Sequence, residues 1–113
     1  VDLIVGSPGE TYNDRLEMVK FIGDMIRHFQ IQVHMHAFIP LPSTPWANEL
    51  QEEIEPDIHK SLKNFAAAGH LDGWWENQIG LGRQQRLAAR NQALAKAQNP
   101  QRIQRKKNVI PGE

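Results

Sequence analysis

Apolar positions recur with two different spacings in the first forty residues. The run Val1–Val5 is short, β-branched and nearly all apolar, which is typical of a buried parallel strand. Between Tyr12 and Phe29 apolar residues return every three or four positions, which predicts a helix with one apolar face; its members are Leu16, Val19, Ile22, Ile26 and Phe29. Ile31–Ile39 alternates strictly and predicts a second strand. Strand, helix and strand together predict a βαβ unit with parallel strands.

Turn and capping residues separate these predicted elements. Gly6–Gly9 (GSPG) ends the first strand, and Gly9 can supply the unusual φ that the turn requires. Thr11 followed by Asp14 has the spacing of a capping box at the start of the helix. Three prolines in Pro40–Pro45 predict a stiff turn out of the second strand.

The sequence predicts mostly helices in the part of the chain that follows the proline turn. Pro56-Asp57 opens a helix that carries its apolar residues at Ile58, Leu62 and Phe65 and ends at Gly69. Gly80 and Gly82 are expected to interrupt the helical pattern before a polar, Ala-rich surface helix at Arg83–Gln98. Trp74 and Trp75 are adjacent, so one is expected to be buried and the other to face outward. Trp46 is expected to serve in packing. Because two strands do not make a stable parallel sheet, further strands are expected from sequence before Val1 or from another chain.

The length, cysteine content and charge distribution of the chain limit the classes of protein to which it can belong. The 113 residues suit one domain or less, and the absence of Cys excludes disulfides, thiolate zinc sites and Cys-ligated iron–sulfur clusters within this stretch. The formal charge is zero, yet residues 1–57 carry a net charge of −7 and residues 58–113 a net charge of +7. The basic end contains Arg102, Arg105, Lys106 and Lys107 without interleaved aromatics. A solvated helix and a loose tail are therefore favoured over nucleic-acid binding.

Neither a membrane span nor a secretory leader is visible in the sequence. We therefore expect a cytoplasmic protein with no membrane partner. The chain begins inside a predicted strand and without Met, so we expect a piece of a longer protein.

Several polar residues are candidates for a site at the strand ends. His34 and His36 share the strand face opposite Val33 and Met35, so both imidazoles should point away from the helix layer. They could contact a substrate, transfer protons, ligate a metal with a third ligand, or be satisfied structural histidines. Gly6 permits close approach of a ligand or of neighbouring backbone, and Glu10 could brace the turn by accepting backbone amides.

Two motifs resemble one enzyme superfamily. DLIVGSPGET, followed about thirty residues later by HAFIPLPSTP, resembles the second half of the barrel of radical S-adenosylmethionine (radical SAM) enzymes. The first motif matches a G-x-I-x-G-x-x-E-like pattern at Ile4 and Gly6, departs from it at Asp2, and has Glu10 one residue late. Ser43 replaces the commoner Gly in the second motif. HLDGWWENQ looks like an element found in a subset of these proteins with a cobalamin-binding-like N-terminal domain.

The resemblance implies an α/β fold, a fragment of a (β/α) partial TIM barrel. Residues 1–46 would be the last βαβ part of that barrel, 47–98 a helical C-terminal extension, and 99–113 a basic flexible tail. The whole enzyme would hold a [4Fe–4S] cluster and S-adenosylmethionine, with cobalamin as a possible addition. It would cleave S-adenosylmethionine reductively to a 5′-deoxyadenosyl radical. The cluster ligands would lie outside this segment, so this fragment alone would not be catalytic.

The resemblance also implies roles for named residues. Cofactor contacts are expected at Ile4, Gly6, Glu10, Phe38 and Pro40, and substrate contacts at Asp2, His34 and His36, with no metal ligand in this chain. The expected partners are the missing N-terminal part of the same barrel, a small-molecule substrate and an electron donor. The two turns are expected side by side on one rim.

Two other hypotheses are alternatives to a radical SAM enzyme. In the first, the chain is a non-enzymatic α/β module that binds a partner or nucleic acid through its basic C-terminal helix. In the second, it belongs to a different βα-barrel enzyme that binds phosphate at the Gly6–Gly9 turn.

Overall fold

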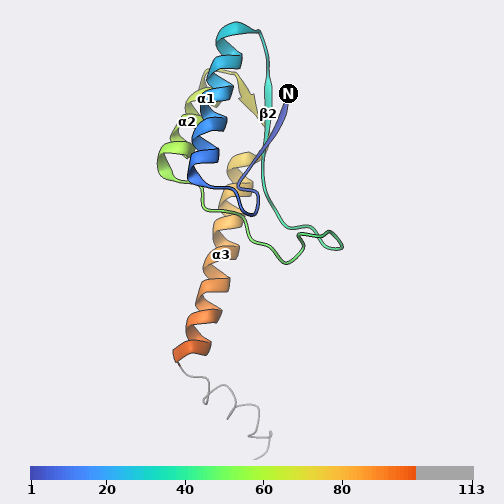
Figure 1. The fold of residues 1–113 in the computed structure, drawn as a ribbon, viewed down its shortest axis with the longest axis vertical. Helices are drawn as coiled ribbons and strands as arrows, with labels where there is room; N and C mark the ends of the chain where they lie inside the picture. The colour runs from blue at the N-terminus through green and yellow to red at the C-terminus, as the bar shows by residue number, and fades with distance from the viewer. Residues whose placement is uncertain (99–113) are drawn as a thin grey trace, which may run out of the picture.

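A parallel three-stranded sheet organises the chain. The computed structural model describes residues 1–98, with elements in the order β1 (Asp2–Val5), α1 (Tyr12–His28), β2 (Val33–Ala37), α2 (Pro56–Ala67), β3 (Leu71–Asp72) and α3 (Trp75–Gln98) (Figure 1). The strand order is β1-β2-β3, and both pairings are parallel. The α/β class and the parallel βαβ unit are therefore confirmed. The predicted basic tail, 99–113, lies outside the described residues.

One face of the sheet carries the core. Val33, Met35 and Ala37 are 1%, 0% and 3% exposed, as the alternation in the sequence predicts. They pack in a cluster with Ile22 of α1 and Ile58 of α2, among others. Figure 1 shows α1 and α2 together on this side of the strands. Within residues 1–98 no helix lies over the opposite face, where the Ile4 side chain is 57% exposed.

Helix α1 begins as predicted, but its buried face differs from the predicted stripe. Thr11 Oγ1 accepts a hydrogen bond from Asp14 N at 3.1 Å, and Asp14 Oδ2 accepts one from Thr11 N at 2.9 Å, which completes the capping box. Leu16 and Phe29, expected on the apolar face, are 39% and 61% exposed. Arg15 is buried instead, because carboxylates neutralise its charge inside the fold.

The segment from 47 to 98 contains a strand and is not wholly helical. Leu71 and Asp72 form β3, which pairs with β2 through Leu71 opposite Val33 and Asp72 opposite His34. A third strand therefore follows β2 in the chain, whereas the sequence predicts further strands only before Val1 or from another chain. Two residues are too few to produce a periodic signal, and β3 forms because Leu71 joins the core at 5% exposure.

Helix α3 continues through both glycines that were expected to interrupt it. Gly82 faces the buried side chain of Gln51, and a Cβ added there would lie 2.2 Å from Gln51 Cδ. The glycine therefore provides room for close packing, and it does not end the helix. Trp75 is 2% exposed and Trp74 73% exposed, which confirms that the two indoles take different faces.

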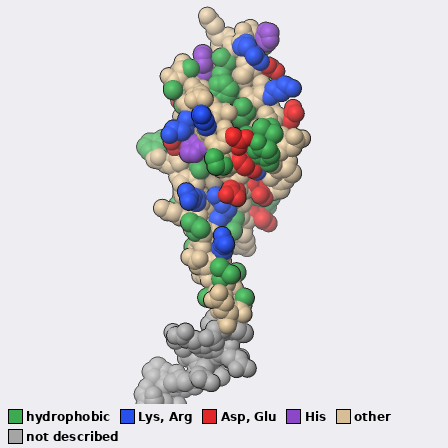
Figure 2. Space-filling view, turned by 90° about the vertical axis from the view of Figure 1, so that its left-hand side faces the viewer, with side chains coloured by type: hydrophobic (Ala, Val, Ile, Leu, Met, Phe, Trp, Pro, Cys, Tyr) green, Lys and Arg blue, Asp and Glu red, His purple; other side chains and the backbone are tan. Residues whose placement is uncertain are grey.

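The outer surface of the helices is charged and mixed. Figure 2 shows Lys and Arg side chains interspersed with Asp and Glu over the helix-covered side. Among the helices that the structure describes, none is both long and apolar enough to traverse a bilayer.

The two glycines of α3 should respond oppositely to alanine. Gly80→Ala meets no atom within 4 Å, so we expect higher helix propensity to stabilise the chain by about 0.5–1 kcal/mol. Gly82→Ala overpacks against Gln51, and we expect a loss of about 1–3 kcal/mol. Urea denaturation of the two variants measures both free energies of unfolding. A similar stabilisation by both substitutions would contradict the close packing of Gln51 on α3.

Candidate functional site

The carboxyl ends of β1 and β2 border one pocket of about 700 Å³. Ser7 reaches it from the glycine turn after β1, while Leu41 and Pro45 reach it from the proline turn after β2. The two turns therefore lie side by side, as expected. The full set of lining residues is Ile4, Ser7, His36, Ala37, Phe38, Ile39, Leu41, Thr44, Pro45, Trp46 and Gln78.

Two aromatic side chains form part of the pocket wall. The ring centroids of Phe38 and Trp46 are 5.7 Å apart with a tilt of 39°. Phe38 is 8% exposed and anchored, whereas Trp46 is 51% exposed. Such a wall suits a planar, largely apolar ligand group. The sequence pattern assigned Trp46 to packing and carried no signal for its place at the pocket.

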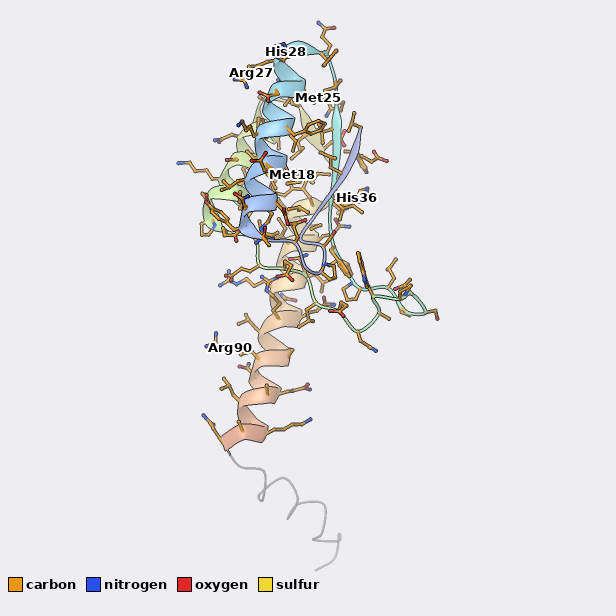
Figure 3. All side chains as sticks on the ribbon, viewed as in Figure 1. Met18, Met25, Arg27, His28, His36 and Arg90 are labelled. Carbon is orange, nitrogen blue, oxygen red and sulfur yellow. The ribbon has the colours of Figure 1, made fainter. Side chains whose placement is uncertain are left out.

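Three of the sequence-predicted residues line this pocket directly: Ile4, His36 and Phe38. Figure 3 shows His36 on the side of the strands that faces away from α1. Pro40 belongs to the bordering turn without lining the pocket. The remaining candidates, Asp2, Gly6, Glu10 and His34, lie outside the lining, and their ligand roles stay predictions.

Gly6 makes close contacts within its own chain. Its φ is 82°, and a Cβ there would lie 2.9 Å from Gln51 Cγ and 3.3 Å from the Glu52 carbonyl oxygen. Glu52 N also donates to Gly6 O at 2.9 Å. The neighbour that approaches Gly6 is therefore the segment before α2, one of the two possibilities that the sequence left open.

Glu10 braces the glycine turn from within. Its Oε1 accepts a hydrogen bond from Gly6 N at 2.9 Å and another from Arg15 Nη1 at 3.1 Å. Arg15, 4% exposed, also pairs bidentately with Glu55, through Nε and Nη2 at 2.7 Å each. The guanidinium thus joins the turn after β1 to the residue that precedes α2.

This network shifts the ionisation of its members. The hydrogen bonds from Arg15 hold the pKa of the Glu55 carboxyl below its ordinary value. The carboxylates in turn raise the pKa of Arg15. The excess of acids over bases in residues 1–57 is visible in the sequence, but no sequence signal indicates that Arg15 is their buried partner.

The buried side chain of Gln51 joins two residues that line the pocket, Phe38 and Gln78. It is 1% exposed, and its Nε2 donates to Phe38 O at 2.9 Å and to Gln78 O at 3.0 Å. Arg86 Nη1 donates to Gln51 O and Oε1 at 3.2 Å each. Gln78 Oε1 accepts from Ala37 N at 2.9 Å, which attaches α3 to the end of β2. Gln78 is the last residue of the HLDGWWENQ segment that carries part of the family resemblance, whereas nothing in the sequence pattern singled out Gln51.

A polar row crosses the open face of the sheet next to the pocket. His34 lies between Asp2 of β1 and Asp72 of β3 in the strand register. His34 Nδ1 and Asp72 Oδ1 are 2.6 Å apart, and Gln32 Nε2 donates to Asp72 Oδ2 at 3.2 Å. These hydrogen bonds, that of His34 first, hold the pKa of Asp72 below its ordinary value. The imidazole of His34 meets that of His36 edge-on, with centroids 4.6 Å apart.

A second hollow of about 660 Å³ lies between α2 and α3. Its basic side chains, Arg83, Arg86 and Arg90, share it with Glu53 and Glu76. Positive and negative side chains both line this hollow, so it does not define a site for an anion. Arg102, Arg105, Lys106 and Lys107, on which the nucleic-acid reading depended, lie outside the described residues. No group of three or more His, Asp or Glu side chains within residues 1–98 is placed to hold a metal ion.

Comparison with known proteins gives one partial similarity. No family model matches the chain, and no solved structure matches it. A curated protein, tRNA-2-methylthio-N(6)-dimethylallyladenosine synthase of Sulfurihydrogenibium sp. (strain YO3AOP1), is 40% identical over 64 residues. The matched stretch is 57% of this chain and 14% of that relative.

The Arg15 network should make stability depend on pH. The pKa of Glu55 is lowered from 4.5 in the folded chain. The ionised Glu55 therefore contributes to the free energy of unfolding fully above pH 4.5, and this contribution is lost as the pH falls through the lowered pKa. We expect Glu55→Gln to cost about 1–2 kcal/mol at pH 7, and the two proteins to converge in stability as the pH falls below the lowered pKa of Glu55.

Urea denaturation across this pH range measures the difference. Glu53→Gln, at an exposed position two residues earlier, is the matched control and should change stability by less than about 0.5 kcal/mol. Equal effects of the two substitutions at pH 7 would contradict the role assigned to Arg15.

Proposed function

We propose that this chain is part of a radical SAM iron–sulfur enzyme and supplies strands and loops to its S-adenosylmethionine and substrate pocket. In that setting β1, α1 and β2 are a βαβ part of a (β/α) barrel, and α2 and β3 continue the parallel sheet after them. The open face of the sheet is then the face turned to the barrel interior. The observation that carries the proposal is the meeting of the two motif turns at one pocket.

The pocket suits the nucleoside end of S-adenosylmethionine. Ile4, Phe38 and Trp46 offer apolar and aromatic surface to an adenine ring, while His36 offers a polar group. The residues present do not suit the cluster, since the chain has no Cys. The cluster ligands are assigned to another part of the enzyme. The bound cluster would supply the electron that cleaves the sulfonium of the cofactor.

The partial relative supports the same reaction class. Its name describes a synthase that makes a methylthio-modified adenosine in tRNA, and such methylthiolation is radical SAM chemistry. We take from it only that class of chemistry, because the match spans 14% of the relative. The substrate of this chain is not carried over. Cobalamin rests on the HLDGWWENQ segment alone and is not part of the proposal.

The whole enzyme provides the direct test. After anaerobic reconstitution with iron and sulfide, the intact protein should show the broad absorbance of a [4Fe–4S] cluster. With a strong reductant it should convert S-adenosylmethionine to 5′-deoxyadenosine, measured by chromatography. An intact protein that takes up no cluster under these conditions would overturn the proposal.

A charge placed in the pocket should weaken nucleoside binding. Ile4→Glu puts a carboxylate against the adenine position, and we expect at least about tenfold weaker binding of S-adenosylhomocysteine because that charge would lose water. Ile4 is not part of the hydrophobic core cluster, so the substitution should not unfold the chain. Fluorescence of Trp46 or calorimetry on the intact protein measures the dissociation constant. Leu81→Glu, 44% exposed on α3 outside the pocket, is the matched control and should leave binding unchanged.

A further inference from the structure

The open face of the sheet holds one imidazole in a fixed orientation. His34 Nδ1 lies 2.6 Å from Asp72 Oδ1, and the second carboxylate oxygen is engaged by Gln32 at 3.2 Å. Both oxygens of Asp72 therefore have partners, so the carboxylate cannot turn without losing one of them. Two strands contribute to this arrangement, because Asp72 of β3 stands opposite His34 of β2 in the strand register.

The chemistry of the pair fixes the position of the proton on the ring. The pKa of Asp72 is lowered, so the group is an ionised carboxylate at neutral pH and can only accept hydrogen bonds. Nδ1 of His34 must then be the donor, and a neutral imidazole keeps its lone pair on Nε2. Nε2 has no hydrogen-bond partner within residues 1–98, and the His34 side chain is 44% exposed.

His34 is also next to the pocket. Its ring contacts that of His36, with centroids 4.6 Å apart, and His36 lines the pocket. Along β2 the two residues are two positions apart on one face, so His34 lies one row deeper than the nucleoside end of the site. A substrate group that extends beyond the nucleoside along this face would reach the row that His34 shares with Asp2 and Asp72.

We propose that Asp72 is a positioning residue that holds His34 with its proton on Nδ1, so that Nε2 accepts a proton from a polarised O–H or N–H of the substrate. In that step the Nε2 lone pair takes the proton, and the electrons of the O–H or N–H bond remain on the substrate. The imidazolium that forms lies against the Asp72 carboxylate, which does not itself take the proton. Binding of a substrate rests on the proposed function; the orientation of the imidazole does not.

The tautomer of His34, measured by NMR, tests the proposed orientation of its imidazole directly. In the intact protein labelled with 15N and 13C at histidine, we expect His34 at pH 8 to show a protonated Nδ1 and an unprotonated Nε2. Asp72→Asn keeps the size of the side chain but can donate to Nδ1, so the signals should move towards protonated Nε2. Glu76→Gln, an acid-to-amide change beside His59 on α3, is the matched control and should leave the His34 signals unchanged.

Chemical reactivity gives a second measure. Diethyl pyrocarbonate acylates unprotonated imidazole nitrogen, so His34 should be modified several-fold faster in the wild-type protein than in Asp72→Asn, as read by mass spectrometry of peptides. Asp72→Glu, which restores a carboxylate, should recover part of that rate. Circular dichroism confirms that each variant is folded. Protonated Nε2 in the wild type, or equal reactivity in Asp72→Asn, would overturn the proposal.

These measurements need neither the cluster nor S-adenosylmethionine. A wild-type chain with the expected tautomer but no cluster would reject the proposed function and keep the orienting pair. An enzyme that holds the cluster and cleaves S-adenosylmethionine, but shows the opposite tautomer at His34, would keep the proposed function and reject the orienting pair.

Discussion

The buried amide of Gln51 is the contact on which the arrangement of the site depends. It joins the end of β2, through Phe38 O, to the first turns of α3, through Gln78 O. Its side chain fits only because Gly6 and Gly82 carry no Cβ. A buried amide without partners is costly, so the segments that satisfy it are held together. The same group thus positions the glycine turn, the exit of β2 and α3 around one pocket.

The two faces of the sheet differ. Side chains on one face stabilise the fold, and side chains on the other are available to a ligand. Val33, Met35 and Ala37 pack under α1 and α2 and supply the core. The alternate positions, His34 and His36, carry polar groups on a face that no helix of the described residues covers. Because strand side chains alternate, a single five-residue strand serves both purposes. Changes on the core face should act on folding and changes on the open face on binding.

Local signals predicted most of the first half of the fold. The apolar run, the capping box at Thr11 and the alternation of β2 each depend on residues close in sequence, so β1, α1 and β2 could be predicted with small errors at their ends. Ile4, His36 and Phe38 could be placed near the strand ends for the same reason. The buried Arg15 could not be predicted, because its partner Glu55 is forty residues away in the chain. The two-residue strand β3 was missed because no period shows in two positions.

The sequence alone determined the parallel βαβ unit, the side of β2 that carries the histidines, and the two motifs that resemble radical SAM enzymes. Tertiary structure decided that β3 joins the sheet and that α3 passes unbroken through its glycines. It decided that Gln51 bonds to Phe38 and Gln78, and that Trp46 lines the pocket with them. It also decided that Asp72 reaches His34. The division has a physical cause. Periodicity and capping act between neighbours along the chain, whereas these contacts join residues between 8 and about 45 positions apart. Only the packed chain brings such residues together.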